Sequence, residues 1–248
     1  MGTLRGQFDV TGDAQSRLDG VQLLADLPAD TLRNLEKRCR WRRYKSEEQI
    51  LDKDSDDRDV YFVVAGSVQV VNFSMTGREI ALARVGAGGF FGELSAIDGQ
   101  PRSASVVAIE NCLLASLSPR LFIDLLRDNA ALALVVMNKL AAIVRSCDER
   151  IMDLSTLGAV QRVYVELLRL AEETGPENGE WAIRNVPTHK VIASRASTTR
   201  ETVARSMSQL ASGGIIDRKG STLYIRGRDR LEKLAGVLEV EFDGALTR

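Results

Sequence analysis

The sequence predicts an α+β fold: an N-terminal antiparallel β-roll of the jelly-roll type, a long helix, and a C-terminal group of helices closed by a β-hairpin. Three observations point to it. Short β-branched runs separated by Gly and Asp fill the first half of the chain, a helical apolar period marks its middle, and two helix patterns before a hairpin pattern mark its end. A chain of 248 residues is longer than most single domains. We therefore expect three parts, at residues 1–127, 128–157 and 158–248.

The first part begins with helical sequence and continues as strands. Within residues 21–40, leucines recur at helical spacing on both sides of Pro28, which predicts two short helices. From Trp41 to about Ser118 the apolar residues come in short runs, and glycines supply the positive φ angles that tight turns need. Five strands are predicted, at residues 60–65, 67–73, 79–85, 103–109 and 112–117. Short strands joined by such turns are typical of an antiparallel roll or barrel.

A helix from Pro119 and then a longer helix, over about 130–157, follow the strands. Along the longer helix, apolar residues alternate steps of three and four, as in the seam of a coiled coil. They are Met137, Leu140, Val144, Cys147, Ile151 and Leu154. Because charged residues flank this seam, we expect a parallel homodimer; the alternative is one helix packed on its own domain. The longest apolar run, 130–137, is less than half of the about 20 residues that span a bilayer, so no contact with a membrane is expected.

The last part has the element order of a winged helix-turn-helix. Helices are predicted at residues 161–174, 188–195 and 199–212, with a short strand at 181–183. The segment 215–225 then reads as a hairpin that turns at Lys219 and Gly220. Two helices followed by a hairpin are the layout in which one helix can enter the major groove of DNA.

Composition excludes several classes of protein. With 44% hydrophobic and 27% charged residues the chain resembles soluble globular domains, and its first ten residues lack the apolar core of a signal peptide, so we expect it in the cytoplasm. Cys39, Cys112 and Cys147 lie far apart with no histidine nearby, so no metal site is expected. The single histidine, His189, leaves no nucleophile and base pair. We therefore expect no catalytic residues and no enzyme.

Charge is distributed unevenly along the chain. Between Arg184 and Arg230 there are ten Lys and Arg against three Asp and Glu, a net charge of +7, which leaves −8 for the rest of a chain whose total is −1. A compact basic segment in an acidic chain indicates contact with a polyanion, because neutralised phosphates release counterions. On charge alone, a merely solvated basic face is an equally good interpretation.

Two short runs of residues form the first candidate site: Phe91-Gly92-Glu93-Leu94-Ser95 and Pro101-Arg102-Ser103-Ala104. Backbone N–H groups near a glycine-rich turn and an arginine are groups that bind a phosphate, the arginine through charge-assisted bonds. The glycines of residues 86–92 are not a dinucleotide fingerprint, because the third is one position late and no βαβ unit surrounds them. The alternative is an ordinary turn with a surface salt bridge between Glu93 and Arg102.

A second candidate site lies in the basic segment, in the run Thr199-Arg200-Glu201-Thr202-Val203-Ala204-Arg205. Arg200, Glu201 and Arg205 lie within about one turn of one another near the start of a predicted helix. An arginine can bind guanine O6 and N7, and a glutamate can accept from cytosine N4. Attraction to phosphate alone would not explain Glu201, whereas reading of bases would; the alternative is a solvated charged helix.

Both runs resemble signatures of the cyclic-AMP receptor protein/fumarate–nitrate regulator (CRP/FNR) family of bacterial transcription regulators, F-G-E-L…P-R-[ST]-A and S-R-E-T-V-x-R. The resemblance covers about residues 20 to 228, in the family's order of β-roll, long helix and winged helix. It implies a homodimer that binds a cyclic nucleotide, cAMP or cGMP, and near-palindromic double-stranded DNA, and that contacts RNA polymerase.

The resemblance also implies site residues. For the nucleotide these are Gly92, Glu93, Leu94, Ser95, Arg102, Ser103, Cys147 and Asp148. Arg102 and Ser103 would bind the cyclic phosphate, and Glu93 would accept the ribose 2′-hydroxyl. For DNA they are Thr188, His189, Thr199, Arg200, Glu201, Arg205 and Lys219.

The chain departs from the family pattern at two places. Ala196 and Ser197 stand where the family usually has a larger aliphatic residue and a glycine, which predicts a turn between the two helices that is looser or slightly different. Cys147 and Asp148 stand where Thr and Ser face the purine. An ionised carboxylate accepts from two donors and so matches guanine N1–H and N2–H₂, which makes cGMP a competitor of cAMP. Alternatively, Asp148 pairs with a neighbouring arginine on the helix surface.

Other members of the family sense different effectors, and the composition weighs against two of them. An iron–sulfur cluster needs four cysteine ligands where this chain has three cysteines. A haem needs an axial histidine in the sensor domain, and His189 lies in the winged helix. Two alternatives stay open: a family member whose β-roll binds no cyclic nucleotide, and a cyclic-nucleotide regulatory module that does not bind DNA.

Overall fold

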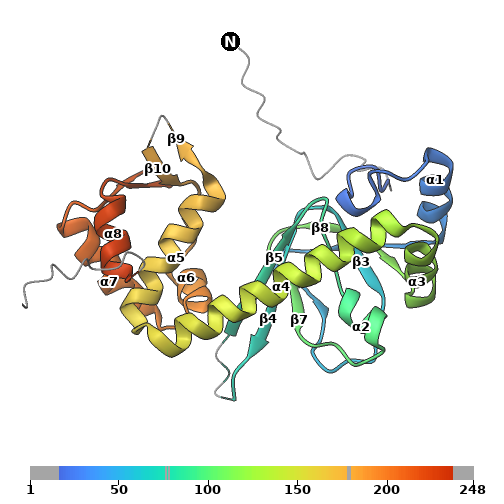
Figure 1. Cartoon of the computed structure of the whole chain (residues 1–248), viewed down its shortest axis with the longest axis horizontal. Coiled ribbons are helices and arrows are strands. Elements are labelled where there is room, and N and C mark those ends of the chain that lie inside the picture. Colours follow the sequence, from blue (N-terminus) through green and yellow to red (C-terminus); the bar gives the residue numbers. More distant parts are fainter. Residues whose placement is uncertain (1–16, 76, 78, 178–179, 237–248) are drawn as a thin grey trace, which may run out of the picture. The chain divides into compact units, whose positions relative to one another are not determined.

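The computed structural model describes residues 17–75, 77, 79–177 and 180–236 (Figure 1). The N-terminal ten residues that we searched for a signal peptide lie outside these ranges, as does the end of the C-terminal tail. The described chain divides into two compact units, residues 1–142 and 143–248, and the division falls within one long helix. Each unit is described by itself.

The first unit is a β-roll of two four-stranded antiparallel sheets. One sheet has the order β1-β8-β3-β6 and the other β2-β7-β4-β5. The strands are β1 (Arg40–Tyr44), β2 (Gln49–Leu51), β3 (Val60–Ala65), β4 (Ser67–Phe73), β5 (Glu79–Gly86), β6 (Phe90–Phe91), β7 (Ser105–Ala108) and β8 (Cys112–Leu117). The predicted strands β3, β4 and β8 are confirmed at both ends, β5 ends one residue later, and β7 is shorter than predicted.

Short helices flank the roll. They are the 3-10 turn η1 (Gln22–Leu24), α1 (Ala29–Arg38), α2 (Glu93–Asp98) and α3 (Pro119–Asp128). Pro119 occupies the first turn of α3, as its sequence position predicts. One apolar core joins these helices to the first sheet through Phe62, Leu117 and Phe122, each of which is fully buried. The roll therefore rests on a core drawn from both its strands and its flanking helices.

Helix α4 (Ala130–Thr156) is the long helix that the apolar period predicts. Its first half packs into the core of the first unit through Leu132 and Val136, with Leu140 partly buried against the same core. By length and composition it is also the one described helix apolar enough to cross a membrane. Leu132 and Val136 cover only part of this apolar surface, since 11% of the most apolar 18-residue window of α4 is buried.

The second unit has the winged helix-turn-helix layout. Its helices are α5 (Ala159–Thr174), α6 (His189–Arg195), α7 (Arg200–Ser212) and α8 (Arg228–Ala235). Its sheet has the order β11-β12-β10-β9, with strands β9 (Pro176–Glu177), β10 (Glu180–Ile183), β11 (Ile216–Lys219) and β12 (Thr222–Ile225). The predicted hairpin is confirmed: Lys219 pairs with Thr222, and Gly220 takes the positive φ of 61° that the turn requires.

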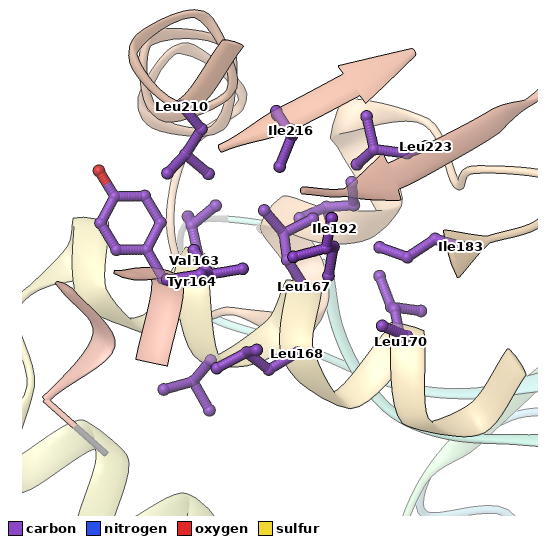
Figure 2. Close-up of a cluster of buried hydrophobic side chains, with 14 of the residues drawn as sticks. Val163, Tyr164, Leu167, Leu168, Leu170, Ile183, Ile192, Leu210, Ile216 and Leu223 are labelled. Carbon is purple, nitrogen blue, oxygen red and sulfur yellow. The ribbon is translucent and has the colours of Figure 1, made fainter. Parts of the chain in front are cut away.

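A single apolar core holds this unit together. Figure 2 shows side chains of α5, such as Val163 and Leu167, meeting Ile192 of α6, Leu210 of α7 and Leu223 of the hairpin. All five are 1% exposed or less. Because the hairpin and the three helices share this core, the wing and the helix-turn-helix form one folding unit.

Candidate functional site: a phosphate-binding cassette and a DNA-facing helix

The first candidate site is built where β6 ends and α2 begins. Gly92 sits at this junction with φ of 87°, a left-handed conformation that glycine adopts without steric cost. A Cβ added to Gly92 would lie 2.7 Å from Nη1 of Arg102 and 2.8 Å from the backbone oxygen of Asp59. Glycine is therefore required here both by backbone conformation and by the close approach of the arginine.

Arg102 lies buried beneath this junction, 3% exposed. Its Nη1 donates to Gly92 O at 2.9 Å, and its Nη2 donates to Asp59 O at 2.5 Å and to Asp57 Oδ1 at 2.8 Å. Among the described residues its Nε has no hydrogen-bond partner. The guanidinium thus ties the start of α2 to residues 57–59 and keeps one buried donor unused.

Asp57 joins Arg102 to an aromatic pair. Its second carboxylate oxygen accepts from Tyr61 Oη at 2.6 Å, and the Tyr61 ring stacks on Phe91 with centroids 5.2 Å apart. Burial acts to raise the pKa of Asp57, but the bonds from Tyr61 and from the backbone of Asp59, with the charge of Arg102, hold it below its usual value. Asp57 is therefore an anion already paired with the predicted phosphate-binding arginine, a partner that sequence reasoning missed.

Glu93 is also paired. Its carboxylate, 5% exposed, lies 3.0 Å from Nζ of Lys139 on α4. The Lys139 ammonium also donates to Phe90 O and lies 3.8 Å from the centre of the Phe90 ring. Burial lowers the pKa of Lys139, and Glu93 partly offsets this. Because Glu93 pairs with Lys139 and Arg102 with Asp57, the alternative of a surface Glu93–Arg102 salt bridge is wrong.

Lys139 is a functional candidate that sequence reasoning missed. One signal could have found it: it is the only charged residue between Asp128 and Arg145, in an otherwise apolar helix. A lone charge in such a stretch usually has a buried partner. Pattern matching could not supply that partner, because Glu93 lies 46 residues away in the chain.

The remaining predicted nucleotide-binding residues differ in their surroundings. Ser95 is buried, and its hydroxyl donates to Pro101 O at 3.3 Å, whereas Leu94 and Ser103 are exposed. Cys147 and Asp148 are exposed on the part of α4 that belongs to the second unit. The structure thus brings Gly92, Glu93, Ser95 and Arg102 together, while roles for Cys147 and Asp148 stay predictions.

The predicted seam of α4 is mostly exposed. Relative exposures are 53% for Met137, 59% for Val144, 60% for Ile151 and 47% for Leu154, and Cys147 is exposed as well. Only Leu140 is partly covered by its own domain. The helix therefore packs on its own roll through Leu132 and Val136 and not through the seam residues. The seam is left as an exposed apolar stripe, of the kind that often marks a contact with a partner.

The second candidate site is the N-terminal end of α7. Both helices of the helix-turn-helix begin one residue later than predicted, because Thr188 and Thr199 are their N-caps. Thr188 accepts from the amide of Val191 and Thr199 from that of Thr202. These caps fix the first turns from which the predicted base-reading residues project.

The polar residues predicted to meet DNA all lie at the surface. Thr188, His189, Thr199, Arg200, Glu201, Arg205 and Lys219 are exposed. The opposite face of α7 is buried through Val203, Ser206 and Leu210. Bonds from its own backbone amide and the Thr199 hydroxyl lower the pKa of Glu201, so it is a carboxylate at neutral pH.

Part of the basic segment is neutralised within the unit. Arg195 pairs with Glu166 and Glu173, Arg226 with Glu180 and Asp217, and Arg228 with Glu172 and Glu232. The count of ten basic residues therefore overstates the charge free to meet a polyanion. Of the other seven, Lys190 lies on α6, Arg200 and Arg205 on α7, Arg218 and Lys219 on β11, Arg184 in the turn after β10 and Arg230 on α8.

Two family models match the chain. The cyclic nucleotide-binding domain matches residues 41–129, and the Crp-like helix-turn-helix domain matches residues 161–234. The first range contains both runs of the first candidate site, residues 91–95 and 101–104, which we call the cassette. The second range contains α6, α7 and the wing, which is the hairpin of β11 and β12.

Individual relatives agree with these matches. The cyclic AMP receptor protein of Thermus thermophilus is 34% identical over 180 residues, 71% of this chain and 79% of the relative. The cAMP-activated global transcriptional regulator of Haemophilus influenzae is 27% identical over 194 residues, 76% of this chain and 85% of the relative. A solved CooA mutant from Carboxydothermus hydrogenoformans shares the fold with a TM-score of 0.75, at 22% identity over 89% of this chain and 99% of that one.

Proposed function

Because the chain belongs to the CRP/FNR family of bacterial transcription regulators, we propose that it binds a cyclic nucleotide and, as a homodimer, near-palindromic double-stranded DNA. One relative is named as a cAMP-activated global transcriptional regulator and another as a cyclic AMP receptor protein, and we propose a regulator and not an enzyme here as well. The proposed effector is cAMP or cGMP, with no metal, haem or iron–sulfur cluster. The proposed place of action is the cytoplasm, and the further partner is RNA polymerase.

One observation carries the effector proposal: a buried arginine with an unused donor. The Nε of Arg102 has no partner among the described residues, although two protein carbonyls and Asp57 engage the rest of the guanidinium. A buried donor without a partner is costly, and a cyclic phosphate oxygen would satisfy it. The residues present therefore fit a small phosphate ester.

The ion pair between Glu93 and Lys139 places a condition on the proposed contact between Glu93 and the ribose. Its carboxylate accepts from Lys139, so a ribose 2′-hydroxyl would share or replace that bond. An ionised carboxylate has lone pairs for more than one donor, so Glu93 can accept from Lys139 and from a hydroxyl together. Binding would thus act on α4 through Lys139, which offers a path from the effector to the dimer helix.

The dimer proposal rests on the exposed seam of α4. Four apolar seam residues are about half exposed, an arrangement that a second copy of the same helix would bury in a parallel coiled coil. Two recognition helices related by a two-fold axis contact two half-sites of a near-palindrome. An effector switches such a dimer only if it binds one state more tightly than the other.

Calorimetry of the full chain with cAMP and cGMP, followed by gel-shift on genomic fragments with and without nucleotide, tests the proposal. We expect one nucleotide to bind and to raise DNA affinity at least tenfold. DNA binding that ignores both nucleotides would support the family member without a nucleotide site. Nucleotide binding without any DNA shift would support the regulatory module.

The choice between the nucleotides is tested at Asp148. If its carboxylate meets the purine, Asp148→Ser should shift the ratio of affinities toward cAMP, because serine no longer offers two acceptors to guanine. An unchanged ratio would place Asp148 on the helix surface.

A further inference from the structure

The turn between α6 and α7 contains a strained residue. Ser197 has φ of 49°, a left-handed conformation that is unfavourable for a residue with a Cβ. Glycine would adopt it without cost. Strained residues persist only where surrounding contacts over-determine them, and they are common at functional positions. The contacts of Ser197 therefore show what the strain serves.

Two arginines hold this turn. Nη2 of Arg150, on α4, donates to the Ser197 hydroxyl at 3.0 Å. Arg162, on α5, donates to Ala196 O at 3.0 Å, to Ser197 O at 3.1 Å and to Leu157 O at 2.8 Å. The turn is thus braced from the end of α4 and from α5.

The hydroxyl bond depends on serine, whereas the backbone bonds do not. Glycine at 197 would keep both acceptors of Arg162 and relieve the strain, but it would lose the bond to Arg150. Serine is thus the residue that joins this turn to α4.

Arg150 lies in partly buried surroundings that contain other charged groups. It is half-buried, and burial lowers its pKa while the buried carboxylate of Glu166 acts in the opposite direction. Glu166 in turn lies 2.5 Å from Nε of Arg195, the last residue of α6.

The same turn of α4 carries the exposed seam. Ile151, next to Arg150, is 60% exposed, and Leu154 is 47% exposed. One stretch of helix therefore presents an apolar residue for a second copy and a guanidinium for the helix-turn-helix.

We propose that Arg150 and Ser197 form a clamp that fixes recognition helix α7 relative to the dimer helix and so sets the spacing between DNA half-sites. This inference rests on the proposed function, because spacing has meaning only for a dimer on DNA. Base contacts lie on α7 itself, so the clamp acts on half-site spacing and not on half-site sequence.

Palindromes that differ by one base pair in the spacer test the clamp. The half-site is first selected from random DNA with the wild-type chain. We expect Ser197→Gly and Arg150→Met to keep the half-site preference and to lose at least fivefold of the discrimination between the best spacer and its neighbours. Ser212→Gly, at the exposed end of α7, and Arg127→Met, exposed on α3, are matched controls that should keep wild-type discrimination.

Hydrogen exchange on the full chain without DNA tests the same clamp independently of function. Arg150→Met should speed amide exchange at residues 196–202 severalfold, and Arg127→Met should not. Ser197→Gly relieves strain, so unfolding cannot account for its effect. The clamp is overturned if both variants keep the wild-type discrimination between spacers, or if amide exchange is unchanged in Arg150→Met. If the wild-type chain binds no palindrome, the proposed function is overturned instead.

Discussion

Lys139 on α4 and Glu93 on α2 form an ion pair, with Nζ and Oε2 3.0 Å apart. The pair joins α2 to the first half of α4 within one compact unit. Its carboxylate is buried, so each partner depends on the other for compensation of its charge.

Lys139→Met should lower the free energy of unfolding by about 2 kcal/mol, because it leaves the Glu93 carboxylate buried without its cation. Urea unfolding of the full chain at pH 7 measures this. Lys139→Arg keeps the charge and should lose much less. In the double variant with Glu93→Gln the two losses should not add, and full additivity would show that the residues do not interact.

Arg102→Leu should abolish binding of either cyclic nucleotide, because it removes the cation and the unused donor proposed for the phosphate. It should also destabilise the roll by about 2–4 kcal/mol, since it leaves two buried carbonyls and Asp57 without their donor. Asp57→Asn is the matched control: it weakens the ion pair but keeps the arginine. Calorimetry should show nucleotide binding retained in Asp57→Asn, and undiminished affinity in Arg102→Leu would contradict the cassette assignment.

Arg200→Ala should cost about 1–3 kcal/mol of affinity for the specific site and relax base preference, because its side chain is exposed at the start of α7. Lys219→Ala, in the wing, should weaken binding to all sequences alike and reduce the salt dependence. Fluorescence anisotropy on specific and random duplexes separates the two. Equal losses on both duplexes for both variants would argue against base reading by α7.

Stability should fall as pH rises from about 4.5 to about 7 because of Glu166. Burial raises the pKa of this carboxyl from 4.5 to about 7, even though Arg195 acts to lower it. Between these values the folded chain keeps a proton that the unfolded chain releases, so the free energy of unfolding decreases as pH increases.

Urea unfolding between pH 5 and 8 should show this decrease, on the order of 2 kcal/mol. Glu166→Gln should flatten it. Glu173→Gln, which alters the exposed carboxylate on the same arginine, should keep it. A slope that survives in Glu166→Gln would assign the titration to another group.

The sequence by itself determined the elements that have a strong local pattern. Strands β3, β4 and β8, helix α4 and the hairpin of the wing follow from apolar periodicity and turn residues, since these depend on neighbours in the chain. Strands β1, β2, β6 and β9 were missed. β1 is a polar edge strand, and the other three have three residues or fewer, so none has a periodic pattern to detect.

Only the tertiary structure decided the partners of the charged groups. Motifs placed Glu93 and Arg102 in one site, but their partners, Lys139 and Asp57, lie 46 and 45 residues away in the chain. The bond from Arg150 to Ser197 likewise spans 47 residues. Ion pairs between distant residues leave no periodic signal, because they depend on which elements fold side by side and on how deeply each charge is then buried.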